Sequence, residues 1–404
     1  MKIAVIGGGA AGMAAAYYLN KQGHYVGLFE RQPMLGGNIR TLNKNVRPSH
    51  TECVEILESG PLEFPNTFHN FVALMNELDV KLLPVAVGSG LFTESGTRFL
   101  SGVASNRNAK GMQRIIEQLR FNAVNLQSVG LWLKVRAASS AVFHNQPLSQ
   151  HLKEDLVSHL WLKLLTMYSY SIPLEYIDEV PAELALPMLR DYLSVKWLRV
   201  EGGVYSYIEK IVERFKGDIF TNVEIANIYR SADTVKIECA DSEIHEFDKV
   251  VFATPPDQVL TMLADPDDVE RKRFSPWKGN HITTVVHRDR SMYSSYGVRH
   301  PSEFDFVQSN HRWGYNCYLN QLCGVSSLEK YILSFQLEDN IQEDKIIHVQ
   351  KQHTPFYTTE AFQHRNEIIE TNGESNTYYA GAYLGDGLHE GAISSAVKVA
   401  RLIG

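Results

Sequence analysis

A cluster of glycines near the N-terminus carries the strongest chemical signal in the sequence. Gly7, Gly9 and Gly12 have the spacing G-x-G-x-x-G, between a short apolar β-branched run and an alanine-rich, helix-forming stretch. Glycine at these positions permits a tight turn, close approach of the backbone to a pyrophosphate, and close packing of helix on strand. The N-terminus of the following helix offers unpaired N–H groups and a positive dipole end to phosphates, and Ala10 and Ala11 between the glycines are expected at the cofactor too. The cluster predicts a dinucleotide-binding turn.

The elements around the glycines have the order that such a site requires. Residues 2–6 predict a strand buried on both faces, residues 13–20 a helix, and residues 25–29 a second strand that ends at Glu30 and Arg31. An acid at the end of the second strand accepts hydrogen bonds from ribose hydroxyls. A solvated surface acid would look the same in the sequence, so the glycines are the more specific part of the signal. These residues alone leave NAD and FAD both open.

Composition excludes several other classes of protein. The chain has 404 residues, 44% of them apolar and 21% charged, and a net charge of −7, so nothing draws it toward nucleic acid. Its length predicts about two to three domains. Four cysteines without a C-x-x-C pair indicate neither a zinc site nor a thioredoxin-type motif, and we expect no metal.

The N-terminal glycines lie in an uncharged run, residues 3–20, that superficially resembles a signal peptide. Glycines are a poor fit to the apolar core of such a peptide, and no other stretch approaches the roughly 20 apolar residues of a membrane-spanning helix. We therefore expect a cytoplasmic protein with no transmembrane segment, and peripheral membrane contact stays open.

A second glycine pair brings a resemblance to a known family. Gly36 and Gly37 follow Glu30 closely, and this order resembles the FAD-binding start of the flavin-containing amine oxidase superfamily. That superfamily includes amine and amino-acid oxidases, protoporphyrinogen oxidase, phytoene-desaturase-like enzymes and a fatty-acid isomerase. In many members an arginine directly follows the glycine pair and contacts the pyrophosphate. Asn38 stands there in this chain, and the nearest arginine, Arg40, either has that role or is a solvated loop residue.

Later segments resemble the same superfamily. A Gly-Gly pair at residues 202–203 resembles its return into the cofactor domain, and a valine after the next strand packs beside the adenine in the family. The resemblance assigns to the cofactor site Gly60 and Pro61 of an acid-x-Gly segment, Val223, and Ala253, Thr254 and Pro255 at a strand end.

The last thirty residues resemble the closing segment of the family. A strand at residues 377–381 leads into a glycine-bearing loop and then a helix at residues 392–403. The resemblance implies that the N-terminus of this helix faces the negative charge that a reduced flavin carries near N1 and O2. The expected cofactor residues here are Gly381, Ala382, His389, Glu390, Gly391 and Ala392. His389 either contacts flavin or substrate or is an inert loop histidine.

The catalytic side chains are not evident from the sequence. Many amine-oxidizing members carry a lysine under the flavin N5, and the corresponding slot lies near Thr283, which is not a lysine. The usual covalent cysteine is also missing, so we expect noncovalent FAD. The candidates for side chains beside the flavin are Thr283, Tyr315, Tyr383 and His389. The aromatic strand at residues 313–320 is either core or a pocket wall, and residues 167–173, with two tyrosines, either line a pocket or form a buried turn; we favour core and turn.

The resemblance implies an α/β fold with two domains. A discontinuous, Rossmann-like FAD-binding domain of the GR2 type is expected over residues 1–62, 203–265 and 372–404. An inserted α+β substrate domain is expected over residues 63–202 and 266–371, with helical patterns at 66–78, 111–133, 148–167 and 182–193.

The leading functional hypothesis is an FAD-dependent oxidoreductase of the oxidase, dehydrogenase or desaturase type. It would remove hydride from a C–H bond of a largely apolar small molecule to flavin N5, with O2 or another carrier as the electron acceptor. The alternatives are a redox-neutral flavin-dependent isomerase or desaturase of unsaturated fatty acyl chains, a non-catalytic FAD-binding interaction protein, and an NAD dehydrogenase. Either a monomer or a homodimer is compatible with the sequence.

Overall fold

A five-stranded parallel sheet gathers segments from both ends and the middle of the chain. The computed structural model describes residues 1–50, 53–138, 140–153, 156–191 and 195–404. In the sheet, β1 lies in the centre of the order β18-β12-β1-β2-β8 and all neighbouring strands are parallel. Its strands are β1 (Lys2–Ile6), β2 (Tyr25–Glu30), β8 (Asp218–Thr221), β12 (Lys249–Phe252) and β18 (Thr377–Tyr379). The predicted α/β class and Rossmann-like sheet are confirmed.

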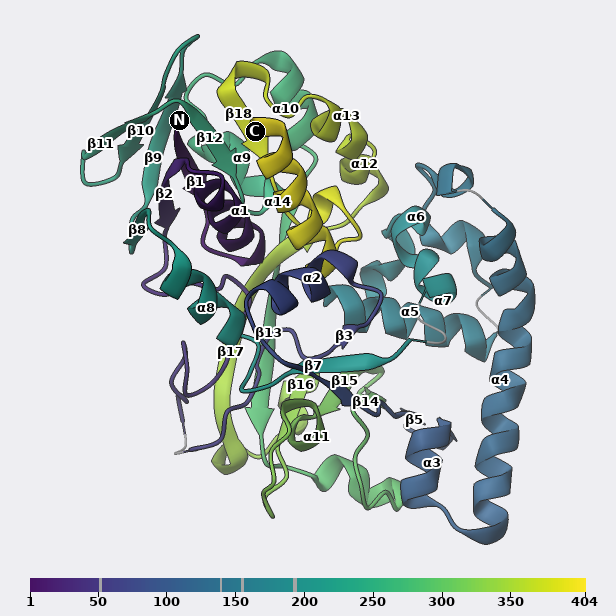
Figure 1. Cartoon of the computed structure of the whole chain (residues 1–404). Coiled ribbons are helices and arrows are strands. Elements are labelled where there is room, and N and C mark those ends of the chain that lie inside the picture. Colours follow the sequence, from purple (N-terminus) through teal and green to yellow (C-terminus); the bar gives the residue numbers. More distant parts are fainter. Residues whose placement is uncertain (51–52, 139, 154–155, 192–194) are drawn as a thin grey trace.

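The first and last helices cover this sheet together. α1 (Ala10–Lys21) and α14 (His389–Ile403) pack against each other, and Figure 1 shows the two ends of the chain side by side. Small residues such as Ala14 and Ala396 are fully buried where these layers meet. The uncharged N-terminal run is thus β1 and α1, buried in the core of a folded domain. None of the helices in the described ranges combines the length and the apolar character that a membrane crossing requires.

A second, larger sheet forms the other half of the molecule. It has seven strands in the order β17-β13-β16-β15-β14-β5-β6, and all neighbours are antiparallel except β14 and β5. β13 and β17 form a long ribbon that reaches from this sheet to the first one (Figure 1). The strands are β5 (Ser89–Thr93), β6 (Gly96–Leu100), β13 (Lys278–His287), β14 (Phe304–Ser309), β15 (Arg312–Tyr318), β16 (Ile332–Phe335) and β17 (Ile346–Phe356).

Two small sheets complete the strands. The antiparallel meander of β9 (Ile225–Arg230), β10 (Val235–Cys239) and β11 (Ile244–Phe247) follows β8. β7 (Trp197–Val200) pairs with both β3 (Phe64–Pro65) and β4 (Leu82–Val85).

Helices form in the regions where the sequence predicts them, but several differ from the predicted ranges in length or continuity. α2 (His69–Glu77) and α4 (Gly111–Ala137) form where helices were expected, and α4 runs along the outer edge of the molecule in Figure 1. The pattern at 148–167 is wrong as one helix, because a 3-10 turn, Leu148–His151, precedes α5 (Val157–Tyr170). The pattern at 182–193 is divided by Pro187, which lacks the N–H that a continuous helix needs, and its last two residues lie outside the described residues.

The remaining helices are short connectors. They are α3 (Gly102–Asn108), α6 (Ala182–Ala185), α7 (Pro187–Asp191), α8 (Ser206–Arg214), α9 (Val259–Met262), α10 (Asp268–Phe274), α11 (Leu319–Cys323), α12 (Thr359–Phe362) and α13 (Arg365–Glu370).

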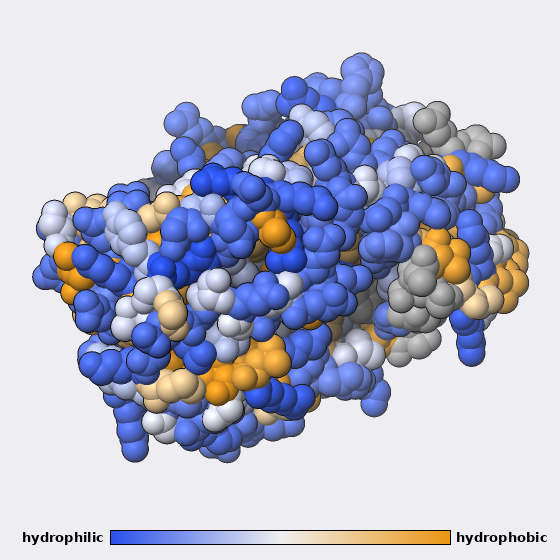
Figure 2. Space-filling model, turned by 90° about the horizontal axis from the view of Figure 1, so that it is seen from above, coloured by the Kyte–Doolittle hydropathy of each residue, from blue (hydrophilic) through white to orange (hydrophobic). Residues whose placement is uncertain are grey.

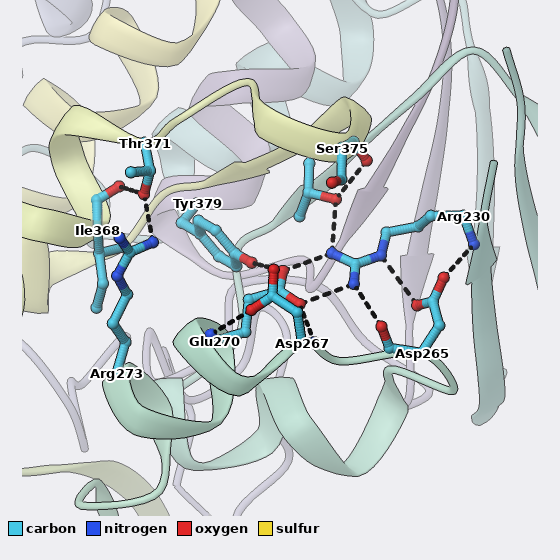
Figure 3. Close-up of polar contacts among 10 residues, drawn as sticks. Arg230, Asp265, Asp267, Glu270, Arg273, Ile368, Thr371, Ser375 and Tyr379 are labelled. Carbon is cyan, nitrogen blue, oxygen red and sulfur yellow. Dashed lines mark hydrogen bonds and ion pairs between the residues drawn. The ribbon is translucent and has the colours of Figure 1, made fainter. Parts of the chain in front are cut away.

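A buried ion-pair network fixes the edge strand β18. Arg230 of β9 donates to both oxygens of Glu270 on α10, at 2.5 and 2.8 Å, and to Asp265 at 3.0 Å (Figure 3). Tyr379 of β18 donates to the same Glu270 at 3.0 Å. Such a network is costly to break, because removing one partner leaves a buried charge unpaired. It therefore holds the strand that leads directly into Gly381.

Candidate active site

A cavity of about 730 Å³ extends from the carboxyl edge of the parallel sheet to the second sheet and α5. Ligands of open α/β sheets bind at this edge. Most of the residues expected to meet cofactor or substrate border the cavity. They are Gly7, Gly9, Ala10, Ala11, Glu30, Arg31, Gly36, Gly37, Asn38, Arg40, Gly60, Pro61, Val223, Ala253, Thr254, Pro255, Tyr315, Gly381, Ala382, Tyr383, His389 and Ala392. Gly12, Thr283, Glu390 and Gly391 do not border it.

The glycine cluster has the geometry that its spacing predicts. A Cβ on Gly12 would lie 1.8 Å from the Gly7 carbonyl oxygen, so glycine is required there for α1 to pack on β1. Gly7 has a φ of +104°, which favours glycine in the tight turn. A Cβ on Gly9, in contrast, would meet only the Cα of Gly37, at 3.7 Å. Gly9 thus faces space, and that space is where a pyrophosphate would lie.

Two further features fit an anionic group at this end. Gly9 caps α1 without any side-chain hydrogen bond, which leaves the first amides of that helix free to bind phosphate. The Arg40 side chain is buried, with 4% of its surface exposed. Its Nη2 donates to Gln32 at 2.6 Å, while its Nη1 has no partner. Burial lowers the pKa of Arg40, against the nearby charge of Glu30. A buried cation with a free donor at a cavity fits a pyrophosphate and does not fit a solvated loop residue.

Glu30 is held by its own loop. Its two carboxylate oxygens accept from the amides of Gly8 and Gln32, at 2.7 and 2.8 Å. These bonds orient the carboxylate at the rim of the cavity and leave lone pairs for further donors. The amide of Val223 donates to the Glu30 carbonyl at 3.0 Å, so that N–H is already paired inside the protein. Val223 therefore offers a ligand its carbonyl and side chain.

The closing segment differs from the expectation at two positions. The Glu390 carboxylate points away from the cavity and accepts from the amides of Asn70 and Phe71, both at 2.9 Å, which caps the first turn of α2. The Gly391 amide donates to Asp386 at 2.8 Å and is not available to a ring in the cavity. The same carboxylate accepts from Leu388 at 2.9 Å, so Asp386 caps the N-terminus of α14. Both polar groups are thus paired inside the protein and do not border the cavity, and their role at the cofactor stays a prediction.

The candidate Thr283 lies next to a second threonine, Thr284, that faces the cavity. On β13, Thr284 is buried, borders the cavity and donates to the Ser59 carbonyl at 2.9 Å, whereas Thr283 does not border it. Alternate residues of a strand face opposite sides, so a shift of one exchanges cavity for exterior. Lys351, opposite Thr283 on β17, is exposed to solvent and borders the cavity.

The other end of the cavity is apolar and aromatic. α4, α5, β14 and β15 contribute its walls, and several of the rings contact one another: Tyr168 stacks on Phe304 at 5.0 Å and meets Tyr315 edge-on at 5.0 Å. The lining residues of this chamber, as we call it, are Phe121, Trp161, Leu162, Leu165, Tyr168, Tyr170, Met188, Phe304, Tyr315 and Leu333. The segment at residues 167–173 thus lines the pocket, and the preferred interpretation as only a buried turn was wrong.

One carboxyl group stands among these rings. Glu63 borders the cavity, and its Oε1 accepts from the Tyr168 hydroxyl at 2.5 Å. Its Oε2 is buried and has no partner. Burial raises the pKa of Glu63 to about 7, although the hydrogen bond from Tyr168 opposes the shift. Glu63 is therefore poised between its neutral and ionised forms near neutral pH, with one free oxygen for a ligand.

Tyr383 and His389, two further candidates, also border the cavity. The Tyr383 hydroxyl is buried without a partner, and burial raises the pKa of Tyr383. The His389 Nε2 lies 2.9 Å from the Tyr207 hydroxyl, and its ring meets Phe64 and Phe71 edge-on. Burial lowers the pKa of His389 to about 4, so this ring is neutral at pH 7. His389 is a packed, uncharged part of the wall.

Sequence reasoning missed several residues of the cavity. Gln32, the partner of Arg40, directly follows the predicted acid and could have been found from that position. Glu63 and Phe121 gave no local signal, because an isolated acid and a helical phenylalanine occur throughout any sequence. In the described parts of the chain, no group of three or more His, Cys, Asp or Glu side chains is arranged to hold a metal ion.

Comparison with known proteins agrees with the geometry of the cavity. A family model described as "Flavin containing amine oxidoreductase" matches residues 10–287. The flavin-dependent L-tryptophan oxidase RebO of Lentzea aerocolonigenes is 24% identical over 260 residues, which cover 58% of this chain and 54% of the oxidase. A 4,4'-diapophytoene desaturase of Staphylococcus aureus is 22% identical over 315 residues, covering 69% and 60% of the two chains. The chain thus spans little more than half the length of these curated relatives.

Solved structures show the same fold over the whole chain. A CLA-producing fatty acid isomerase from P. acnes superposes with a TM-score of 0.71 at 18% identity, covering 100% of this chain and 98% of the isomerase. Putrescine oxidase bound to putrescine superposes with a TM-score of 0.69 at 13% identity, with 100% and 99% coverage. The chain belongs to the flavin-containing amine oxidoreductase family, and its cofactor is FAD.

Proposed function

We propose that the protein is an FAD-dependent oxidoreductase that removes hydride from a C–H bond of a largely apolar organic molecule. The observation that carries the proposal is one continuous cavity that has two chemically different ends. One end has a buried arginine, open glycine backbone and an uncapped helix N-terminus, and the other end is the aromatic chamber with Glu63. Such a cavity suits a cofactor with a pyrophosphate and a substrate brought against its ring.

We assign the cofactor to the first of these ends. The pyrophosphate would lie against Gly9, the first turn of α1 and Arg40, the ribose against Glu30, and the adenine beside Val223. Loop residues from the other strand ends, among them Gly60, Ala253 and Gly381, would surround the rest. This assignment also supports a cofactor-binding domain of residues 1–62, 203–265 and 372–404, because all five strands of the parallel sheet come from these segments.

The residues of the chamber position the substrate and exclude water. Bound FAD supplies the hydride-accepting chemistry, so side chains contribute mainly orientation and a dry environment. The rings of Tyr168, Tyr315 and Trp161 provide an apolar wall, and the free Oε2 of Glu63 accepts a hydrogen bond or faces a positive charge on the substrate. Thr284 and Tyr383 complete the contact zone between the two ends.

The curated relatives are consistent with a substrate that combines an apolar body with few polar groups. Their names describe action on L-tryptophan, which is an aromatic amino acid, and on 4,4'-diapophytoene. A redox-neutral isomerase of unsaturated acyl chains is the second candidate, because the chamber, which borders Leu162, Leu165 and Leu333, would also hold an acyl chain.

Anaerobic mixing of the FAD-loaded protein with candidate substrates tests the proposal. Long-chain amines, aromatic amino acids and unsaturated fatty acids are the probes, and bleaching of the flavin absorbance is the readout. We expect bleaching by one class, and a loss of its rate in Glu63→Leu. Product formed without consumption of any electron acceptor would favour the isomerase. A flavin that dithionite reduces but that no probe bleaches or converts would favour a non-catalytic FAD protein and contradict the proposal.

A further inference from the structure

The long helix α4 carries apolar side chains on both of its sides. Toward the protein, Phe121, Val124, Leu131 and Val135 pack inward, and Phe121 borders the aromatic chamber. Toward solvent lies a second apolar row. This outer row consists of Met112, Ile115, Ile116, Leu119, Leu126, Val129 and Leu133, all exposed.

The two rows lie on opposite sides of the helix. The outer residues 126 and 133 each follow an inner residue, 124 or 131, by two positions, and two positions turn an α-helix by about 200°. The outer positions 112, 119, 126 and 133 recur every seventh residue, with 115 and 129 between them, so they form one continuous stripe. Leu119 is 63% exposed and Leu126 is 73% exposed. A contiguous stripe of this kind is unusual on a soluble protein and marks a contact surface.

Charge indicates what covers the stripe. α4 and its N-cap carry five basic residues and one acid, in a chain whose net charge is −7. The acid, Glu117, is buried on the inner side and pairs with Arg120 at 2.8 Å. The outer side of α4 therefore carries no acid, and Lys134 and Arg136 flank the stripe near its C-terminal end. Two copies of such a face would repel each other, whereas an anionic lipid surface would attract it.

We propose that the outer face of α4 docks the protein on an anionic lipid surface. The apolar stripe would enter the acyl boundary while the flanking basic side chains meet the headgroups, as in an interfacial amphipathic helix. Figure 1 shows α4 at the outer edge of the molecule, and the side chains of the outer row are exposed. Figure 2, seen from above, shows a mostly hydrophilic surface with separate hydrophobic groups, one of them on the right, at the helical end. The inner side of the same helix borders the chamber, so docking would bring the chamber next to the lipid.

Co-sedimentation of the full chain with lipid vesicles tests this inference, and it does not depend on the flavin reaction. The probes are vesicles of phosphatidylcholine with phosphatidylglycerol, and vesicles of phosphatidylcholine alone. We expect binding to the anionic vesicles that high salt weakens, and a fall of about fivefold for each charge removed in Lys134→Gln and Arg136→Gln. We expect Leu119→Asp with Leu126→Asp to reduce binding at least about tenfold, because two buried apolar contacts are lost.

Matched variants separate docking from general effects. Leu328→Asp replaces an equally exposed leucine outside α4, 98% exposed, and should bind vesicles like the natural chain. Lys398→Gln on α14 removes an exposed charge elsewhere and should also leave binding unchanged. The inference is overturned if the natural chain stays in the supernatant with anionic vesicles, or if Leu328→Asp loses as much binding as the double variant. A dimer in light scattering that the double variant converts to a monomer, without vesicle binding, would assign the stripe to a second copy and overturn it too.

Discussion

The two ends of the cavity differ in what lines them: mainly backbone at the cofactor end and side chains at the chamber end. At the cofactor end, the contacts come mainly from backbone: glycines at 7 and 9, the first amides of α1, and loops at the ends of parallel strands, together with the buried side chain of Arg40. At the chamber end, the contacts come from side chains that α4, α5, β14 and β15 bring together from distant parts of the chain. Where a ligand contacts backbone, any added side chain takes the place of the ligand. Where a ligand contacts many side chains, the loss of one contact leaves the others in place. We therefore expect substitutions at the cofactor end to have the larger effects.

Gly9→Val should have the largest effect. The structure leaves room for a side chain at Gly9, so the protein should fold, but the valine would occupy the space assigned to the pyrophosphate. We expect a folded protein that purifies without flavin absorbance. Gly130→Val, at an exposed helix position where an added Cβ meets nothing within 4 Å, is the control and should retain the cofactor. A folded Gly9→Val protein with normal flavin content would show that the backbone end does not bind the pyrophosphate.

Arg40→Met should weaken FAD binding without abolishing it. Loss of a hydrogen bond to a charged group costs about 1.5 to 3 kcal/mol, or roughly 10- to 150-fold in affinity. Titration of the apoprotein with FAD measures this change, and Arg312→Gln, an exposed arginine elsewhere, is the control. Equal FAD affinities of Arg40→Met and the natural chain would show that Arg40 does not bind the pyrophosphate.

Glu63→Gln should change the pH dependence of stability. The folded-state pKa of Glu63, about 7, lies above the ordinary value of 4.5, so the folded protein holds this proton more tightly than the unfolded chain. Its contribution to stability is therefore present at low pH and is lost as pH rises from about 4.5 to about 7. The Tm of the natural chain should fall relative to that of Glu63→Gln across this window. The Tm of the control Glu360→Gln, at an exposed position, should depend on pH as the Tm of the natural chain does. The same pH dependence of Tm in Glu63→Gln would contradict the argument that burial raises the pKa of Glu63.

Tyr168→Phe should have the smallest effect. The hydroxyl donates to Glu63 and lowers its pKa, so removing it should move the pKa of Glu63 further upward while the ring still fills the chamber. Once a bleaching substrate is known, the pH midpoint of KM should shift upward, with kcat at low pH nearly unchanged. A shift downward, or a large loss of kcat at every pH, would mean that Tyr168 acts on the reaction itself.

The same contrast explains how much the sequence could predict. The cofactor end depends on glycines and an acid within one β-α-β unit, so the spacing of these residues in the first forty positions predicts it. The choice of Thr283 depended only on its position in the family's strand, and the neighbouring Thr284 is the residue that borders the cavity. Glu390 and Gly391 pair with Asn70 and Asp386, and the glycine-bearing loop pattern alone does not reveal these contacts. Glu63 and the aromatic wall required the tertiary structure, since Tyr168, Phe304 and Phe121 meet only after folding.

The most direct test of the account is the identity and stoichiometry of the chromophore in the purified protein. Heat or acid should release FAD from a yellow protein, one per chain, leaving a colourless polypeptide because the cofactor is noncovalent. A colourless protein that cannot be reconstituted with FAD but binds NADH would contradict the account and move the chemistry of the cavity to a nicotinamide.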